Sequence, residues 1–525
     1  MCGIVGYVGG RRALPILLEG LRSLEYRGYD SAGVALTGRE GLWVARRAGK
    51  VAELTEAVNG RDRGETAGVG HTRWATCGPP TEPNAHPHRD CSGRTAVVHN
   101  GIIENHQELR ARLIAEGHTF TSETDTEVAV HLVEGHLAST GSLYEAVRAA
   151  VGEIEGTFAL VFVSGDDPEL IVGARMDAPL IAGLGRGESF IASDATPLIE
   201  HTRRVVPLQN RQIVEARPSG IRVTDFDGNE VAFQETEVTW DHEAAEKSGY
   251  PDFMLKEIHE QPGAVRDTLR GRSWTAGPRD LDELRMSEED IRRVDKVFVV
   301  ACGSSFHAGL VAKYAIERWT RLPVEIDIAS EFRYRDPILD ANTLVVGISQ
   351  SGETADTLAA VRYAREQGAK VVAIANVVGS SITRESDAVL YTHAGPEVGV
   401  AATKTLTTQM AALWLLAVWM ADTRGAVRPE EARSLLEHLS GLPAKMEETL
   451  ADQAEVLRAA ERFADAPTFL FVGRGVGYPV ALEGALKLKE ISYLHAEGFA
   501  AGEMKHGPIA LLEAGVPVVA IATTS

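Results

Sequence analysis

The second residue of the chain, Cys2, places a thiol where a free amine can also stand. The sequence begins MCGIVGYVGG, and a residue as small as Cys2 permits removal of the initiator Met. Cys2 would then carry an α-amine that titrates at about pH 8 and can accept the thiol proton at neutral pH. One residue would therefore supply both a nucleophile and a general base.

Three further stretches of the N-terminal half carry side chains suited to chemistry: HTRWATCG at 71–78, HNGIIENH at 99–106 and SETDTE at 122–127. With CGIVG, LEYRGYDSAG and NAHPH they resemble the class II glutamine amidotransferase domain, which belongs to the N-terminal nucleophile hydrolases. The resemblance implies that Cys2 attacks the side-chain amide of glutamine, with its own α-amine as base. It assigns the resulting oxyanion to the Asn100 side chain and the Gly101 backbone N–H.

The same resemblance implies a pocket for the amino-acid part of glutamine. Arg73 takes the α-carboxylate in a bidentate fork, and Asp125 takes the α-ammonium. The other residues carried over into this pocket are Trp74, Thr76 and His86. Simpler roles remain for two of these residues, because Arg73 beside Trp74 could form a surface cation–π pair and Asp125 could cap the following helix.

The cysteines of this half allow a competing interpretation. Cys77 stands where the family usually has His, so the loop that bears Trp74 is expected to close differently. The residue types of Cys77, His86, His88 and Cys91 would also suit zinc. The family pattern already accounts for the HPH stretch, however, and the resemblance implies no metal and no organic cofactor.

In the C-terminal half, ACGSSFHAG at 301–309 and GISQSGETAD at 347–356 each follow an apolar strand and open a helix. Helix N-termini bind phosphate well, and ligands of doubly wound sheets lie at the carboxyl ends of the strands. The two loops resemble those of the sugar isomerase (SIS) domain, although ordinary helix caps would explain either loop alone. The resemblance assigns the phosphate to Ser305, Ser349, Gln350, Ser351 and Thr354, and it lines the pocket with Ser304 and Val400.

A second reactive group lies in ALEGALKLKEISYLHAEGFAAGEMKHGP at 481–508. Glu483, Lys487 and Glu490 fall at i, i+4 and i+7, which is one face of a helix, although a surface Glu–Lys pair would explain the first two. With FMLKEIHEQP at 253–262, the stretch resembles the glucosamine-6-phosphate synthase family over essentially the whole chain. The family implies that His506 assists ring opening, that Glu490 moves a proton between C1 and C2, and that Lys487 and Glu483 support developing charges.

The implied activity joins the two halves. Ammonia released from glutamine passes through a protein-enclosed channel to fructose 6-phosphate, which gives glucosamine 6-phosphate and glutamate, the first step of hexosamine (UDP-N-acetylglucosamine) synthesis. Family members continue past GVPVVAIATTS to a tail lysine that forms a Schiff base with the sugar. A glutaminase with an inactive sugar-phosphate half is therefore the alternative, and a sugar-phosphate sensor is another. SIS domains commonly pair, so a homodimer is expected.

Two kinds of scaffold must position these residues. Residues 2–240 contain short β-type segments between Gly, Pro and Asp turns, with helical patterns at 104–117 and 124–138, which predicts an α+β domain with much antiparallel sheet. Residues 241–285 are expected to be a linker. Apolar runs that open into Gly-rich turns then predict doubly wound α/β (Rossmann-like) SIS domains at 286–430 and 455–525. The second SIS domain is expected to be incomplete and to stop at its second strand.

Composition excludes several classes of protein. The formal net charge of −21 argues against a nucleic-acid or anionic-membrane surface. No apolar run approaches the roughly 20 residues that a membrane span requires. Four cysteines in 525 residues do not suggest a disulfide framework. The N-terminus also lacks the basic region and long apolar core of a signal peptide, so a cytoplasmic location is expected.

Overall fold

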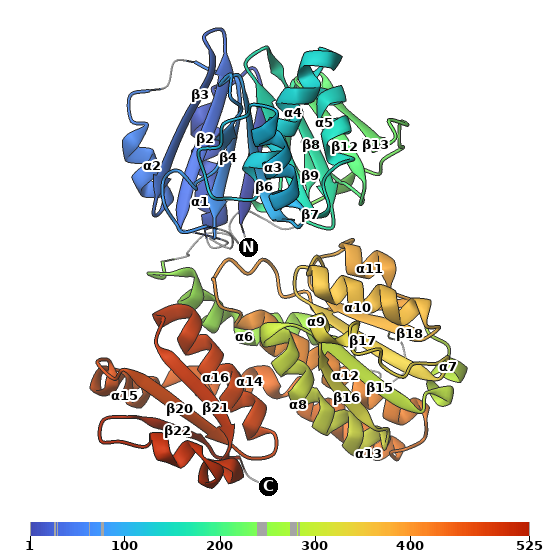
Figure 1. Ribbon diagram of the computed structural model, residues 1–525. Helices are drawn as coiled ribbons and strands as arrows, with labels where there is room; N and C mark the ends of the chain where they lie inside the picture. Colours follow the sequence, from blue (N-terminus) through green and yellow to red (C-terminus); the bar gives the residue numbers. More distant parts are fainter. Residues whose placement is uncertain are drawn as a thin grey trace. The chain divides into compact units, whose positions relative to one another are not determined.

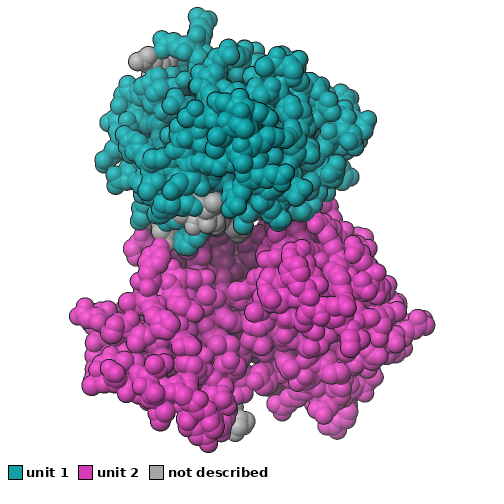
Figure 2. Space-filling view, viewed as in Figure 1, with its two compact units in different colours: residues 1–245 teal, residues 246–525 magenta. Residues whose placement is uncertain are grey.

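The chain forms two compact units, residues 1–245 and 246–525 (Figure 2). The structure is a computed structural model that describes residues 2–25, 28, 30–61, 64–74, 78–238, 249–272, 281 and 284–523. The domain boundary expected at residue 240 falls within 239–248, outside these ranges.

The first unit contains two antiparallel sheets (Figure 1). The first has the order β14-β11-β9-β10-β1-β4-β2-β3 and the second the order β13-β12-β8-β7-β6-β5. The strands of the first sheet are β1 (Gly3–Gly9), β2 (Ser31–Gly38), β3 (Gly41–Ala48), β4 (Ala67–Arg73), β9 (Ile181–Leu184), β10 (Glu188–Ala192), β11 (Arg204–Pro207) and β14 (Thr236–Glu237). Those of the second are β5 (His88–Arg89), β6 (Thr95–Ile103), β7 (Gly156–Ser164), β8 (Asp167–Met176), β12 (Gln212–Arg217) and β13 (Gly220–Asp225).

Helices cover the outer faces of both sheets. The helices α1 (Ala13–Leu24) and α2 (Val51–Ala57) pack on the first sheet, and α3 (His106–Ala115), α4 (Glu127–Thr140) and α5 (Leu143–Val151) pack on the second. In β1, Ile4 and Val8 belong to the core between the sheets, whereas Val5 and Tyr7 belong to the core under α1. Strand residues alternate between faces, and both faces of β1 are buried. The unit is therefore a four-layer α/β/β/α sandwich, as the α+β prediction requires.

The second unit contains a five-stranded parallel sheet of order β16-β15-β17-β18-β19. The helices α8 and α12 cover one face, and α9, α10 and α11 cover the other (Figure 1). The strands are β15 (Lys296–Ala301), β16 (Val324–Ile328), β17 (Thr343–Ser349), β18 (Lys370–Ala375) and β19 (Ala388–Tyr391). The helices are α8 (Gly303–Thr320), α9 (Ala329–Phe332), α10 (Ala355–Glu366), α11 (Ser381–Glu385) and α12 (Lys404–Thr423). This is the predicted doubly wound α/β arrangement.

A smaller parallel sheet of order β21-β20-β22 forms the second copy of this pattern. Its elements are β20 (Thr468–Gly473), α16 (Gly477–Ser492), β21 (His495–Ala500), the 3-10 helices η4 (Ala501–His506) and η5 (Pro508–Leu511), and β22 (Val518–Ile521). The described sheet thus has three strands where two were expected. The missed strand β21 lies at an edge, is partly exposed and carries polar residues, so a search for uninterrupted apolar runs does not find it.

The segment expected to be a linker includes a long helix. Helix α6 (Phe253–Leu269) packs against α12 and against α14 (Leu442–Ala451). The remaining helices of this unit are α7 (Glu288–Arg293), α13 (Pro429–Ser440) and α15 (Ala454–Phe463). Within the described ranges, no helix combines the length and the apolar composition that a bilayer crossing requires.

Candidate active sites

Cys2 directly precedes β1 and lies beside the end of β4. The backbone N–H of Trp74 donates to Cys2 Sγ at 3.3 Å, and Sγ lies 3.6 Å from the Trp74 carbonyl oxygen. Burial raises the pKa of the Cys2 thiol, and the Trp74 N–H and the Arg73 charge offset this only in part. A thiol with a raised pKa stays protonated at neutral pH, so nucleophilic chemistry at Cys2 requires a base.

Gly28, within LEYRGYDSAG, lies very close to this hydrogen bond. A Cβ atom on Gly28 would lie 2.6 Å from Trp74 N and 2.7 Å from the Arg73 carbonyl carbon. The next described residue, Asp30, donates its backbone N–H to the Arg73 carbonyl at 3.0 Å. Only glycine fits at residue 28 without displacing the peptide that bonds the thiol.

Asn100 lies next to the nucleophile with its amide orientation fixed. Asn100 Nδ2 donates to the Cys2 carbonyl at 3.0 Å. His71 Nε2 lies 3.0 Å from both Asn100 Oδ1 and the His99 carbonyl. A carbonyl only accepts, so His71 Nε2 carries the hydrogen and Asn100 must turn Oδ1 toward it. Burial lowers the pKa of His71 to about 3, which keeps this ring neutral.

Gly101 follows Asn100 in β6 and needs to be glycine. Its φ is +133°, and a Cβ atom there would lie 2.0 Å from the Thr157 carbonyl oxygen. The structure therefore brings Cys2, Asn100 and Gly101 together, as the resemblance implies. Stabilising an oxyanion requires donors held in place next to the nucleophilic residue, and Asn100 Nδ2 is held at the Cys2 carbonyl.

Arg73 is buried at the end of β4 and contacts the following loop. Its side chain is 4% exposed and donates to the Gly78 carbonyl at 3.2 Å and to the Pro79 carbonyl at 3.4 Å. Asn84 Nδ2 donates to the same Pro79 carbonyl at 3.1 Å and to Glu123 Oε2 at 3.2 Å. Such burial argues against the surface cation–π role, and Asn84 links the Arg73 loop to the SETDTE segment.

Asp125 lies in that segment and is also buried. Its Oδ2 accepts the backbone N–H of Ile103 at 2.8 Å, at the end of β6. The N-cap of α4 is the next residue, Thr126, whose side chain makes no capping hydrogen bond. The helix-cap alternative for Asp125 therefore has no support in the structure.

The histidines of NAHPH lie in a buried group. His86 Nδ1 accepts the backbone N–H of His99 at 3.4 Å, and His88 Nε2 lies 3.0 Å from Thr124 Oγ1. Burial lowers the pKa of His86, His88 and His99. The zinc alternative grouped these rings with Cys91, but Cys91 Sγ lies instead beside His118 and His131. Thr76 and Cys77 lie outside the described residues.

In the second unit, the loop after β17 gathers hydroxyl groups at the start of α10. Ser349 Oγ lies 2.9 Å from Thr354 Oγ1 and accepts the backbone N–H of Gly352 at 3.0 Å. Ser351 Oγ accepts the N–H of Glu353 at 3.2 Å. Three predicted phosphate ligands thus line one turn at a helix N-terminus, where the partial positive charge favours anions. The fourth, Gln350, accepts the Asn376 N–H through its backbone carbonyl at 3.1 Å.

The predicted face of α16 is present and meets the start of α8. Lys487 Nζ lies 2.5 Å from Glu490 Oε2 and 3.4 Å from Glu483 Oε1, and it donates to Ser304 Oγ at 3.0 Å. Glu483 Oε2 lies 2.6 Å from His307 Nδ1. Burial acts to raise the pKa of Glu483, but His307, Lys487 and Ser304 together bring it below its usual value. The group therefore favours an ionised Glu483.

Three predicted residues stand apart from this group. Ser305 is half-buried in the first turn of α8, and Val400 is 47% exposed in the loop after β19. His506 is exposed at the end of η4. No hydrogen bond recorded for the described part of the chain joins His506 or Val400 to the α16 group.

Comparison with known proteins identifies both halves. The glutamine amidotransferase domain model matches residues 71–200, and the SIS domain model matches 290–419 and 462–525. A glutamine–fructose-6-phosphate aminotransferase (isomerizing) of Streptomyces coelicolor is 56% identical over 99% of this chain and 85% of its own length. The enzyme of the same name from Mycobacterium tuberculosis is 55% identical over the same shares.

The chain belongs to the glutamine–fructose-6-phosphate aminotransferase (isomerizing) family. A solved structure agrees for the second unit. The C-terminal domain of glucosamine-fructose-6-phosphate aminotransferase from Francisella tularensis is 43% identical, with a TM-score of 0.51 over 52% of this chain and 77% of that chain. The predicted family and fold class, an amidotransferase domain followed by SIS domains, are confirmed.

Four residues of the sites in this aminotransferase chain were not predicted. His71 orients Asn100, Asn84 links two loops of the glutamine half, and His307 bonds Glu483. Glu257 accepts the backbone N–H groups of Val398 and Gly399, next to Val400. All four lie within motifs that the sequence already singles out, so motif membership was the available signal.

Proposed function

We propose that this chain transfers ammonia from glutamine to fructose 6-phosphate with isomerisation, giving glucosamine 6-phosphate and glutamate. The observation that carries the proposal is the pairing of a Cys2–Asn100 site in one unit with a Glu483–Lys487–Glu490 site in the other. The names of the relatives, which align with 99% of the chain, favour this activity over a glutaminase with an inactive sugar half.

In the glutamine half, the α-amine of Cys2 takes the thiol proton and Sγ attacks the amide carbon. Asn100 Nδ2 and the Gly101 N–H stabilise the oxyanion, and ammonia leaves as the thioester forms. Water then hydrolyses the thioester to glutamate. We assign the glutamine pocket to Arg73 and Asp125, and the family resemblance adds Trp74, Thr76 and His86 as further pocket residues.

In the sugar half, the phosphate of fructose 6-phosphate binds the loop that begins at Ser349. The ligands are Ser305, Ser349, Gln350, Ser351 and Thr354, with Ser304 and Val400 as further pocket residues. Glu490 transfers the proton between C1 and C2 as general acid and base, and Lys487 and Glu483 stabilise developing charge. His506 assists opening of the sugar ring. Condensation of ammonia at C2 releases one water, which balances the water used at the thioester.

The two half-reactions are tested together by following glutamate and glucosamine 6-phosphate separately. With both substrates present, we expect the two products in equal amounts, and Cys2→Ala should abolish both. A preparation that retains Met1 tests the amine separately, because it keeps the Cys2 thiol but holds the Cys2 nitrogen in a peptide bond. It should hydrolyse little glutamine. Glutamate release without glucosamine 6-phosphate would refute the transfer and support the glutaminase.

Two further properties belong to this proposal. The protein is expected to act in the cytoplasm, where both substrates are metabolites, and to form a homodimer through its SIS domains. Sedimentation equilibrium of the purified chain measures the second property directly.

A further inference from the structure

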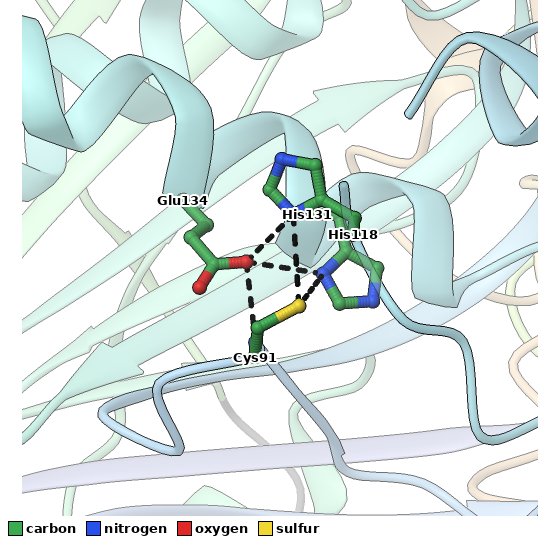
Figure 3. A group of neighbouring side chains, drawn as sticks. All are labelled: Cys91, His118, His131 and Glu134. Atoms are coloured by element: carbon green, nitrogen blue, oxygen red, sulfur yellow. Dashed lines mark hydrogen bonds and ion pairs between the residues drawn. The ribbon is translucent and has the colours of Figure 1, made fainter. Parts of the chain in front are cut away.

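A group of four side chains in the first unit lies outside the predicted glutamine site. Cys91 is in the turn between β5 and β6, His118 follows α3, and His131 and Glu134 lie one turn apart on α4 (Figure 3). Each contributes one potential ligand atom, and these atoms all lie within 4.8 Å of one another. Three segments of the chain thus converge on one point.

The separations of these atoms match a tetrahedral metal site. Zinc bonds of about 2.3 Å to sulfur and about 2.0–2.1 Å to nitrogen, at tetrahedral angles, place sulfur and nitrogen about 3.6 Å apart. Cys91 Sγ lies 3.7 Å from His118 Nδ1 and 3.6 Å from His131 Nδ1. Nitrogen and oxygen ligands of one zinc ion should be about 3.3 Å apart, and Glu134 Oε2 lies 2.9 Å and 3.2 Å from the same two nitrogens.

Backbone groups orient the Cys91 sulfur and the Glu134 carboxylate. Cys91 Sγ accepts the N–H of Thr119 at 3.3 Å. The Glu134 carboxylate accepts the N–H groups of Cys91 and Ser92, both at 3.1 Å. These bonds fix a sulfur and an oxygen toward the same centre, as the outer contacts of metal ligands commonly do.

The second ring nitrogen of His131, Nε2, is also buried. The His131 side chain is 1% exposed, and its Nε2 is buried without a hydrogen-bond partner among the described residues. The nearest recorded charge is Glu127 Oε1, at 3.8 Å. A metal-bound imidazole usually donates from its other nitrogen to a carboxylate, and the Glu127 carboxylate lies near His131 Nε2 but beyond hydrogen-bond distance.

Without a metal, Glu134 could accept hydrogen bonds from both Nδ1 atoms. Because Cys91 has a single S–H, it can donate to at most one of the two nitrogens that lie within 3.7 Å of its Sγ. A divalent cation instead balances one thiolate and one carboxylate and makes use of all four atoms. Thiolate and imidazole ligands favour zinc over magnesium or calcium, and four protein ligands indicate a structural site.

We propose that Cys91, His118, His131 and Glu134 bind a structural zinc ion in the amidotransferase unit. The ion would hold together the β5–β6 turn, the loop after α3 and helix α4. That loop leads into residues 122–127, which carry Asp125, and the turn follows His88, which contacts Thr124. Zinc would therefore stabilise the segment that forms one wall of the glutamine pocket.

The test measures metal binding by the full chain and does not depend on either enzymatic activity. After chelation and desalting, the protein is titrated with zinc and, separately, with cobalt(II), whose thiolate charge-transfer absorption reports sulfur ligation. We expect one tightly bound ion per chain. Cys91→Ser should remove the charge-transfer band, and His118→Asn should weaken zinc binding at least about tenfold.

Two matched variants control for other thiols and imidazoles. Cys302→Ser removes a thiol of the second unit, and His136→Asn removes a ring of α4 that pairs with Glu153 instead. Both should bind metal like the unchanged chain. Because Cys91 and His118 lie at or near the surface, their variants should fold, and circular dichroism checks this. Absence of bound metal, or metal binding unchanged in both Cys91→Ser and His118→Asn, would overturn the proposal.

Discussion

Glu257 is a buried carboxyl group whose ionisation should be measurable as a loss of stability. It lies on α6 with 2% exposure, and its Oε1 accepts the N–H groups of Val398 at 2.5 Å and Gly399 at 3.0 Å. Burial raises its pKa from 4.5 to about 7, and the charge of Glu397 adds to the rise, while the two N–H groups and Lys404 oppose it. The change to test is Glu257→Gln, which keeps an acceptor oxygen for both N–H groups.

The direction and size of the effect follow from linkage. A pKa raised in the folded state means that folding favours the protonated form, so its stabilising contribution is complete below pH 4.5 and is lost as the pH rises through about 7. The shift of 7 − 4.5 = 2.5 units corresponds to about 3 kcal/mol at about 1.4 kcal/mol per unit. The Gln variant cannot ionise and should not lose this amount.

The assay is calorimetric unfolding of the full chain between about pH 5 and about pH 8. For a unit of this size, 1 kcal/mol shifts the melting temperature by roughly 2–4 °C. As the pH rises across this range, the melting temperature of Glu257→Gln should therefore rise relative to that of the unchanged chain by at most about 6–12 °C. Glu448→Gln, an exposed residue of α14, is the control and should follow the unchanged chain. The same pH dependence in Glu257→Gln and the unchanged chain would refute the argument from burial.

Four substitutions test the sites themselves. Asn100→Ala should lower kcat for glutamine hydrolysis roughly 100- to 1000-fold through loss of the oxyanion donor; glutamate release measures it, and a near-normal kcat would remove Asn100 from this role. Ser349→Ala and Thr354→Ala should each weaken fructose 6-phosphate binding by about 1–3 kcal/mol in calorimetric titration, whereas unaltered affinity would exclude these hydroxyls as ligands. Glu483→Gln should lower glucosamine 6-phosphate formation roughly 100-fold by misplacing Lys487. Direct assay of this product measures the effect, and an unchanged rate would contradict the prediction.

The sequence predicted those strands whose apolar pattern reflects their burial in the fold. The strand GIVGYVG and the runs that become β15 and β17 are apolar because both of their faces are covered. The edge strands β16 (VEIDI) and β21 (HAEGFA) carry polar residues and lack that pattern, so both were missed. Helix α6 was absorbed into the expected linker, since only its packing on α12 and α14 reveals its buried face.

In the candidate sites, the motifs indicated which residues carry chemistry. They did not indicate which distant residues contact them and fix their positions. The contact of Asn100 with Cys2 spans 98 residues, and that of His307 with Glu483 spans 176. Such pairs depend on how distant elements meet, which no local spacing encodes. The four-residue group at Cys91 shows this most clearly, because the sequence suggested a different set of partners for the same thiol.

The attachment of Cys2 to β1 bears on how precisely the nucleophile is held. Strand β1 lies inside the first sheet between β10 and β4, and all of its residues are buried. Amide groups in such a central strand exchange with solvent mainly through global opening of the domain, so this segment resists local opening. A chain terminus ordinarily frays. Cys2 is joined to this buried strand by one peptide bond, so the position of its thiol depends on the domain core and is protected from the fraying of a free chain end.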